Sequence, residues 1–259
     1  MEPVDRAADG GIGRLTYRER KPHPALADYI ACTWADEARP GLRVLPDGCI
    51  DIVWIGDEAL TVAGPDTAAN VTGLPEGTLT VGVRFRPGRA PGFLGARADE
   101  LTDQSVGLEA LWGPDAQALA EVLASTPSAE GKQSVLEAAL LERLDEVRQV
   151  DGEVDAALDV IAAAPSRTRI GALSRDLNVS ERQLRRRFEQ AVGYGPKHFG
   201  RVLRFRAFLS LVEDHGYPLA QAAAEAGYAD QAHLTRECND LAGLTPTELL
   251  AVRNVQDPS

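Results

Sequence analysis

The pattern of hydrophobic and polar positions predicts β-strands in the first part of the chain. Residues 79–86 alternate with a period of two, with Leu, Val, Val and Phe on one face and Thr, Gly, Arg and Arg on the other. This alternation predicts a half-buried strand, and residues 50–54 form a shorter candidate strand after a turn at 46–48. Because residues 40–95 are also rich in Gly and Pro, we expect several short strands joined by turns.

The hydrophobic spacing becomes helical after residue 106. Between residues 106 and 150 it predicts two helices. The apolar stripe of the first contains Leu119, Val122 and Leu123, and that of the second contains Val135, Leu136, Ala139, Leu140 and Leu144. From about residue 152 onward the chain is predicted to be entirely helical, with segments at 154–163, 169–177, 181–192, 196–213, 218–226, 231–242 and 246–253.

Capping residues mark the boundaries of these last helices. Ser180 followed by Gln183, and Thr245 followed by Glu248, have the form of a capping box. Asp230 can cap the helix that follows it, and glycines at 193, 216, 227 and 243 stand where helices would end.

Two pairs of the predicted helices have the proportions of a helix-turn-helix, namely 170–177 with 181–192 and 219–226 with 231–242. Such a motif exposes one helix, which can enter the major groove of DNA. The sequence therefore predicts an α+β protein with two domains. Residues 1–150 form a β-rich sensing or dimerisation domain that ends in two helices, and residues 152–255 form an all-α domain with two helix-turn-helix motifs.

The charge distribution supports a DNA-binding role for the helical part. The chain as a whole carries a net charge of -12, which by itself argues against a nucleic-acid partner. However, residues 165–212 contain eleven basic and only three acidic residues, a local charge of +8. An acidic protein with one concentrated basic segment is typical of local binding to a polyanion.

Arginines gather on one face of the predicted helix 181–192. Leu184, Phe188 and Val192 share its core-facing side, which leaves Arg182, Arg185 and Arg186 on another face. The guanidinium fork matches guanine O6 and N7, or a phosphate, with two hydrogen bonds. Such a face is often merely solvated surface, but its place in a helix-turn-helix favours DNA binding. The side chains that can project from helix 231–242 are Gln231, Thr235 and Arg236, and the candidate phosphate contacts are Arg187, Lys197, Arg201 and Arg204.

Residues of about 155–253 resemble the DNA-binding domain of AraC/XylS transcription regulators. The likeness runs from Leu173 through Phe188, Gly195 and Pro196, and on through Gly227 and Tyr228 to Thr245 and Pro246. It implies two recognition helices that enter successive major grooves. It places Arg182, Arg185 and Arg186 at the base-reading positions of the first helix, and Gln231, Thr235 and Arg236 at those of the second.

The second motif departs from the AraC/XylS pattern at core positions. Cys238 stands where the family usually has Phe, and Leu249 stands where it usually has an aromatic residue. The second recognition helix also carries Asp230, Glu237 and Asp240. We therefore expect the first motif to supply most of the affinity for DNA.

The N-terminal part is similar to a less characterised sensor domain that precedes this DNA-binding module in some bacterial regulators. The resemblance implies a barrel-like β-structure. An effector is not identified by the sequence, and the weak candidates for binding one are Arg84, Arg86 and Trp54. For the two arginines, ion pairs with N-terminal carboxylates are the preferred alternative, and Trp54 is most simply a core residue.

Candidate enzymatic chemistry is confined to Cys49, which lies between Asp47 and Asp51. Flanking carboxylates raise the pKa of a thiol and so oppose reactivity. A structural role is therefore preferred, although a chemical or redox sensor that uses Cys49 stays open as an alternative. The three cysteines lie far apart, and the histidines lack metal-binding spacing, so we expect no disulfide framework, metal or cofactor.

The sequence thus predicts a cytoplasmic transcription regulator without catalytic activity and without a membrane partner. Its expected partners are double-stranded DNA, an unidentified small-molecule effector, RNA polymerase and a second copy of the chain. The alternatives are a sensor or enzyme that uses Cys49, and a protein-interaction module whose arginine face binds an acidic partner.

Overall fold

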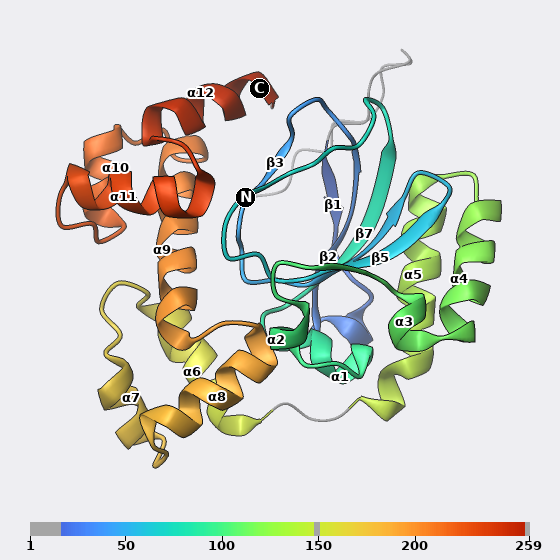
Figure 1. The fold of residues 1–259 in the computed structure, drawn as a ribbon, viewed down its shortest axis with the longest axis horizontal. Coiled ribbons are helices and arrows are strands. Elements are labelled where there is room, and N and C mark those ends of the chain that lie inside the picture. The colour runs from blue at the N-terminus through green and yellow to red at the C-terminus, as the bar shows by residue number, and fades with distance from the viewer. Residues whose placement is uncertain (1–16, 148–150, 257–259) are drawn as a thin grey trace.

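The computed structural model describes residues 17–147 and 151–256, which form a sheet-containing half and a helical half (Figure 1). Six strands make an antiparallel sheet in the order β1-β2-β7-β4-β5-β8. Their bounds are β1 Arg18–Arg20, β2 Ile30–Glu37, β4 Asp51–Ile55, β5 Ala59–Ala63, β7 Leu79–Phe85 and β8 Ser105–Gly107. Strands β3 (Arg43–Val44) and β6 (Asn70–Val71) pair separately as a short antiparallel ribbon.

The sheet does not close into a barrel within the described residues. Strands β1 and β8 stand at its two edges, and the ribbon of β3 and β6 is a separate two-stranded sheet. With three residues each, the edge strands offer few backbone groups for further pairing. The barrel-like domain that the resemblance implies is therefore an open antiparallel sheet.

Strand β7 is buried on both faces, not on one. Val81, Val83 and Phe85 lie in the core as predicted, but Thr80 is also buried. Gly82 pairs with Trp34, and the indole ring covers it so closely that a Cβ at this glycine would lie 2.4 Å from the ring. The expectation of a half-buried strand was wrong because an aromatic side chain from β2 covers the second face.

Helices cover one face of the sheet (Figure 1). The pair α4 (Pro114–Ser125) and α5 (Ala129–Arg143) confirms the two helices predicted after residue 106, and α5 packs against β2 and β7. Leu119, Leu123, Leu136 and Leu140 join the core, but Val122 is 50% exposed because it lies at the flank of its stripe. Short helices connect the sheet to this pair: α1 Ala90–Leu94, α2 Ala98–Leu101 and α3 Glu109–Trp112, with single turns at Pro24–Leu26 and Leu144–Glu146.

The C-terminal half contains seven helices in the described residues, close to the predicted segments. They are α6 Gly152–Ala163, α7 Ile170–Asp176, α8 Glu181–Val192, α9 Pro196–Glu213, α10 Leu219–Glu225, α11 Gln231–Ala242 and α12 Pro246–Gln256. Helix α9 links the two helix-turn-helix pairs, and Phe205 and Phe208 on it are fully buried. The predicted domain boundary at residues 150–152 falls partly outside the described residues.

The two halves share a core and several backbone contacts. Leu45 from the sheet half is buried within the hydrophobic cluster of the helical half. The Ala69 amide donates to the Leu241 carbonyl at 2.7 Å, and the Thr102 hydroxyl donates to the Gly193 carbonyl at 2.9 Å. These contacts hold the C-terminal ends of α8 and α11 against the sheet half.

Candidate nucleic-acid interface

Helix α8 has an exposed polar face. Its position is fixed because the N-terminus of the helix is capped and the opposite, apolar face is packed in the core. The Ser180 Oγ accepts a hydrogen bond from the Gln183 amide at 3.2 Å, and the Gln183 side chain accepts one from the Ser180 amide at 3.1 Å. Leu184 and Phe188 are fully buried behind the helix. The left-handed conformation of Gly193 then ends it. The capping box predicted from the sequence is confirmed.

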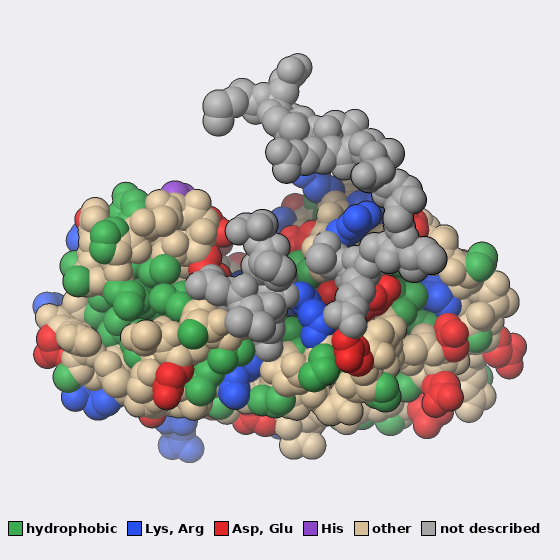
Figure 2. All heavy atoms as spheres, turned by 90° about the horizontal axis from the view of Figure 1, so that it is seen from above, with side chains coloured by type: hydrophobic (Ala, Val, Ile, Leu, Met, Phe, Trp, Pro, Cys, Tyr) green, Lys and Arg blue, Asp and Glu red, His purple; other side chains and the backbone are tan. Residues whose placement is uncertain are grey.

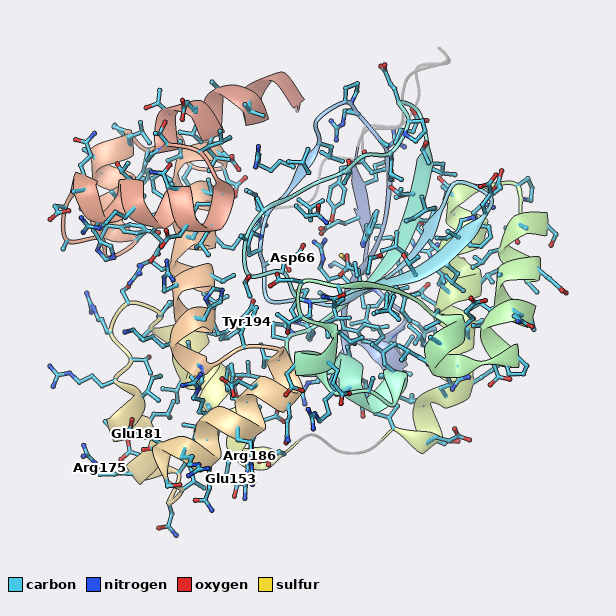
Figure 3. All side chains as sticks on the ribbon, in the orientation of Figure 1. Asp66, Glu153, Arg175, Glu181, Arg186 and Tyr194 are labelled. Atoms are coloured by element: carbon cyan, nitrogen blue, oxygen red, sulfur yellow. The ribbon has the colours of Figure 1, made fainter. Side chains whose placement is uncertain are left out.

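The three predicted base-reading arginines of α8 are exposed. Arg185 pairs with Glu189 one turn later, with 2.7 Å between Nε and Oε1, and its side chain is 72% exposed. Arg182 and Arg186 make no ion pair with any described residue. Figure 3 shows Arg186 on α8 and Arg175 on α7 on the outer side of this helix pair. The face therefore offers unneutralised guanidinium groups to an anionic partner.

Helix α11 repeats this arrangement with fewer charges. The Asp230 carboxylate accepts a hydrogen bond from the His233 amide at 2.6 Å, which caps the helix as predicted. Leu234, Cys238 and Leu241 are buried, so Cys238 occupies the core position expected of it. The predicted base-reading residues of this helix differ in exposure, with Gln231 and Arg236 exposed and Thr235 half-buried.

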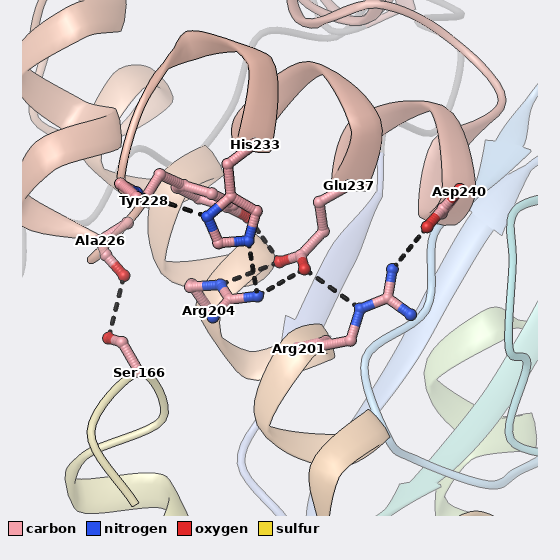
Figure 4. A network of polar contacts seen from close by, with 9 residues as sticks. Ser166, Arg201, Arg204, Ala226, Tyr228, His233, Glu237 and Asp240 are labelled. Carbon is pink, nitrogen blue, oxygen red and sulfur yellow. Dashed lines mark hydrogen bonds and ion pairs between the residues drawn. The ribbon is translucent and has the colours of Figure 1, made fainter.

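A buried carboxylate, Glu237, ties α11 to α9 (Figure 4). Its oxygens accept hydrogen bonds from Arg201 Nε at 3.1 Å, Arg204 Nε at 3.0 Å and Tyr228 Oη at 2.9 Å. Burial alone would raise the pKa of Glu237, but these hydrogen bonds hold it below its usual value. Arg201 also pairs with Asp240 at 2.7 Å. The network fixes how the second helix-turn-helix sits on the linking helix.

The four candidate phosphate contacts lie in different electrostatic settings. Lys197 is exposed, whereas Arg201 and Arg204 are held by Glu237, and Arg204 has only 13% of its side chain exposed. Arg187 lies 3.4 Å from both Asp151 and Glu153. A groove of about 550 Å³ between the two helix-turn-helix motifs is lined by Lys197, Arg201, Arg204 and Arg236, among others.

The role of Glu237 is not predicted by the sequence pattern, in which Glu237 is only one of several acidic residues of the second helix-turn-helix. The available signal was its spacing, because Glu237 lies three residues after Leu234 and four before Leu241, on the buried side of the helix. A carboxylate in that position must be paired with donors to be tolerated.

The weak effector candidates of the sheet half are largely engaged with the protein itself. Arg84 pairs with Asp51 at 3.1 Å and Asp47 at 3.3 Å, and Arg86 donates to the Ala27 carbonyl at 2.9 Å. Trp54 is 1% exposed. The ion pairs of Arg84 agree with the preferred alternative of internal pairing.

The Cys49 thiol lies in surroundings that oppose reactivity. Burial raises its pKa well above the usual value, and the negative charge of Asp47 raises it further. Because the thiolate is the reactive form, this environment gives the thiol no activation. Over the described ranges, no group of metal-ligating side chains is placed to hold an ion, and no helix is long and apolar enough to cross a membrane.

Two family matches cover separate parts of the chain. Residues 18–107 match a family described as a domain of unknown function, DUF6597, and residues 173–251 match the family described as a helix-turn-helix domain. The second match spans both motifs built from α7 to α11. The chain carries an AraC-type helix-turn-helix domain. It is a DNA-binding transcription regulator with an N-terminal domain of the DUF6597 family.

Three solved structures with a similar fold carry the name ToxT, from Vibrio cholerae. An apo lysine-to-alanine variant has a TM-score of 0.50 and 12% identity, covering 90% of this chain and 99% of its own. ToxT with a bound unsaturated fatty acid has a TM-score of 0.46 and 12% identity, with 89% and 96% covered. ToxT bound to a naphthalenyl butenoic acid has a TM-score of 0.47 and 14% identity, with 85% and 97% covered. No curated protein matches the chain.

Proposed function

We propose that this AraC-type regulator reads DNA sequence through α8 and α11, with α8 as the main source of affinity. The observation that carries the proposal is the outward face of α8. The guanidinium groups of Arg182 and Arg186, which make no ion pair with the described residues, stand there on a helix whose N-terminus is capped and whose apolar face is buried. Arg185 completes the base-reading set of this helix, and Gln231, Thr235 and Arg236 form that of α11.

Phosphate contacts are assigned to Lys197, Arg201 and Arg204, which line the groove between the motifs, and to Arg187 on α8. Lys197 is the best placed of them because it is exposed and its ammonium makes no ion pair with the described residues. Arg187, Arg201 and Arg204 are further candidates, but each must first exchange an internal carboxylate for a phosphate oxygen. This exchange lowers the gain expected from each of them.

The N-terminal domain is assigned the regulatory role. It contacts the ends of α8 and α11, so a small-molecule effector bound within it would change how the recognition helices are presented. A second copy of the chain and RNA polymerase are further proposed partners. This function needs no catalytic step, and the unactivated Cys49 thiol supports a structural role for that residue.

Selection of binding sites from random DNA duplexes by the purified full chain tests the proposal. We expect an enriched sequence with two conserved blocks about one helical turn apart, as two recognition helices on one face of the DNA require. Equal binding to the enriched site and to a scrambled duplex at physiological ionic strength would contradict sequence reading. An acidic protein added as a competitor tests the alternative that the arginine face binds any polyanion. Under that alternative, the competitor displaces the selected DNA and the scrambled DNA equally.

A further inference from the structure

One short segment of the sheet half contacts the C-terminal ends of both recognition helices. This segment, residues 65–69, follows β5 and leads into β6, and it is called the spacer below. At one end, Pro65 lies against Gly193, where a Cβ would stand 2.3 Å from Pro65 Cγ. At the other end, the Ala69 amide donates to the Leu241 carbonyl at 2.7 Å. Because the chain from Pro65 to Ala69 spans at most about 14 Å, the spacer limits how far apart the two helix ends can lie.

The spacer is held rigid at its middle. The Asp103 carboxylate accepts hydrogen bonds from the Thr67 amide at 2.7 Å and from the Thr67 hydroxyl at 2.8 Å. The Asp103 amide in turn donates to the Pro65 carbonyl at 3.4 Å. The ring of Pro65 also fixes one backbone dihedral angle at the start of the segment. A segment held in this way transmits a fixed length between its two ends.

The ribbon of β3 and β6 holds the end of α11. Arg43 on β3 pairs with Val71 on β6, and Arg43 Nη1 donates to the Ala242 carbonyl at 2.9 Å. Ala242 is the last residue of α11, and Gly243 then ends the helix in the left-handed conformation. The last carbonyls of a helix have no partner within the helix and carry partial negative charge, which a guanidinium stabilises. The ribbon therefore caps the second recognition helix.

A hydroxyl of the sheet half holds the end of α8 in the same way. Thr102, which follows α2, donates from Oγ1 to the Gly193 carbonyl at 2.9 Å. Gly193 is the residue at which α8 ends, with a φ of +99°. Thr102 also immediately precedes Asp103, which holds the spacer. The contact on α8 and the support of the spacer therefore come from neighbouring residues.

These contacts leave the DNA-reading faces uncovered. The proposed base-reading residues lie in the N-terminal halves of both helices, where Arg182, Arg186 and Gln231 are exposed. The sheet half contacts the opposite, C-terminal ends of the helices. It therefore fixes where the helices stand without blocking their approach to DNA.

We propose that the spacer, held by Arg43 and Thr102, sets the distance and angle between α8 and α11 and so selects the spacing between the two blocks of the operator. Arg43 and Thr102 are positioning residues, because they act on DNA through the helices that they cap. The proposal rests on the proposed function, since both helices must read DNA for their separation to matter.

The spacer also borders a cavity of about 530 Å³ between the two halves. Asp66 of the spacer and Arg43 both line this cavity. Acidic and basic side chains lie side by side in the hollow between the two halves (Figure 2). The spacer is therefore the element through which the regulatory role assigned above to the N-terminal domain reaches both recognition helices.

Operators with altered spacing test the proposal. Adding or removing one base pair between the blocks shifts the second block by about 3.4 Å and turns it by about 35°. We expect the original chain to bind the selected operator at least about tenfold more tightly than either altered duplex, because the second block loses its contacts. Arg43→Ala should reduce this ratio at least about threefold, because α11 loses a charged hydrogen bond at its end and can follow the displaced block. Thr102→Val should also reduce the ratio.

Matched variants separate positioning from a general loss of structure. Arg86→Ala removes an arginine that donates to a carbonyl within the sheet half, also at 2.9 Å, and Thr126→Val removes a hydroxyl that bonds only within its own helix region. Both should leave the ratio unchanged. Arg43→Lys keeps a cationic donor at the helix end and should restore most of the ratio. An unchanged ratio in Arg43→Ala overturns the proposal, and so does tighter operator binding in that variant, which would make the contact autoinhibitory.

Hydrogen exchange tests the contact without DNA. In Arg43→Ala the backbone amides of residues 239–243 should exchange at least about threefold faster, whereas those of α5 should keep their rates. Equal acceleration in α5 would contradict a specific role at the end of α11.

The two kinds of measurement separate this proposal from the proposed function. If site selection enriches no sequence, the proposed function fails, and hydrogen exchange still decides whether Arg43 holds α11. If the chain binds its operator but Arg43→Ala keeps the same spacing ratio, the role of the spacer fails and the regulator stands.

Discussion

The arginines of the helical half fall into two groups that the sequence does not distinguish. Arg182 and Arg186 project from α8 without an ion pair to the described residues, whereas Arg187, Arg201 and Arg204 are held by carboxylates. An unpaired guanidinium can bind a base edge or a phosphate at once. A paired one must give up an internal interaction first, so its contribution to DNA binding is smaller. Replacing an arginine of the exposed face of α8 is therefore expected to affect DNA binding differently from replacing an arginine that is paired with a carboxylate.

Replacing Arg186 with Ala should affect one base pair. The change is expected to cost roughly 1–3 kcal/mol of binding free energy at the base that Arg186 reads and to relax the preference there. Fluorescence anisotropy with the selected operator and its single-base variants measures both effects. Similar losses on all variants would mean that Arg186 contacts the phosphate backbone.

Replacing Lys197 with Ala should affect all sequences alike. Loss of one phosphate contact is expected to weaken every duplex and to reduce the slope of log affinity against log salt by about one unit. Arg201→Ala should reduce the slope less, because Arg201 is already paired with Glu237 and Asp240. Titrations at several salt concentrations compare the two, and an equal or larger reduction for Arg201→Ala would show that its ion pairs open on DNA.

At the scale of single elements, the sequence predicts those helices whose boundaries are set by local capping. Ser180, Asp230 and the glycines at the helix ends act within a few residues, and α8, α9 and α11 begin and end where their signals predict. Strands β3 and β6 have two residues each and depend on partners far along the chain, so no local pattern reveals them. The second buried face of β7 is likewise created by Trp34 from another strand.

The Glu237 network yields a prediction about the second helix-turn-helix. Glu237→Gln keeps the shape of the side chain but removes the charge that holds Arg201 and Arg204. We expect the free energy of unfolding to fall by about 1–3 kcal/mol and the preference in the second block of the operator to relax. Chemical denaturation and site selection measure these effects. Asp240→Asn is the matched control, because Asp240 is 63% exposed and contacts only Arg201 within this network.

The same network has a defined pH dependence. The pKa of Glu237 is lower in the folded chain than in the unfolded chain, so its contribution to stability is present above the unfolded pKa, about 4.3, and is lost as the pH falls through the folded pKa. The original chain should therefore lose more stability between about pH 5 and about pH 3 than Glu237→Gln. Parallel losses would mean that other carboxylates dominate the acid response.

At the scale of the whole molecule, the two candidate sites differ in how far the sequence reveals them. The arginines proposed to read bases from α8 all lie on one helix, so Arg182, Arg185 and Arg186 are found by their spacing alone. The cavity of about 530 Å³ is instead lined by residues from distant segments, among them Trp34, Asp66 and Arg206, and only the fold brings them together. The sequence predicts two domains but gives no sign of how they pack, and the fold buries Leu45 of the sheet half in the core of the helical half.

The contact between the halves can be tested at Gly48, which the fold brings against α9. Gly48 has a φ of +84°, and a Cβ there would lie 2.7 Å from the ring of Phe199. Gly48→Ala combines the left-handed strain of a non-glycine residue, about 1–2 kcal/mol, with overpacking of about 1–3 kcal/mol. Gly95→Ala is the matched control, because Gly95 has a φ of +70° and no atom within 4 Å of such a Cβ. In chemical denaturation, Gly48→Ala should therefore lose more unfolding free energy than Gly95→Ala. Equal losses would mean that the Phe199 ring moves aside at little cost and that the two halves are not tightly packed. An effector bound to the sheet half would then have no rigid connection to α8 and α11.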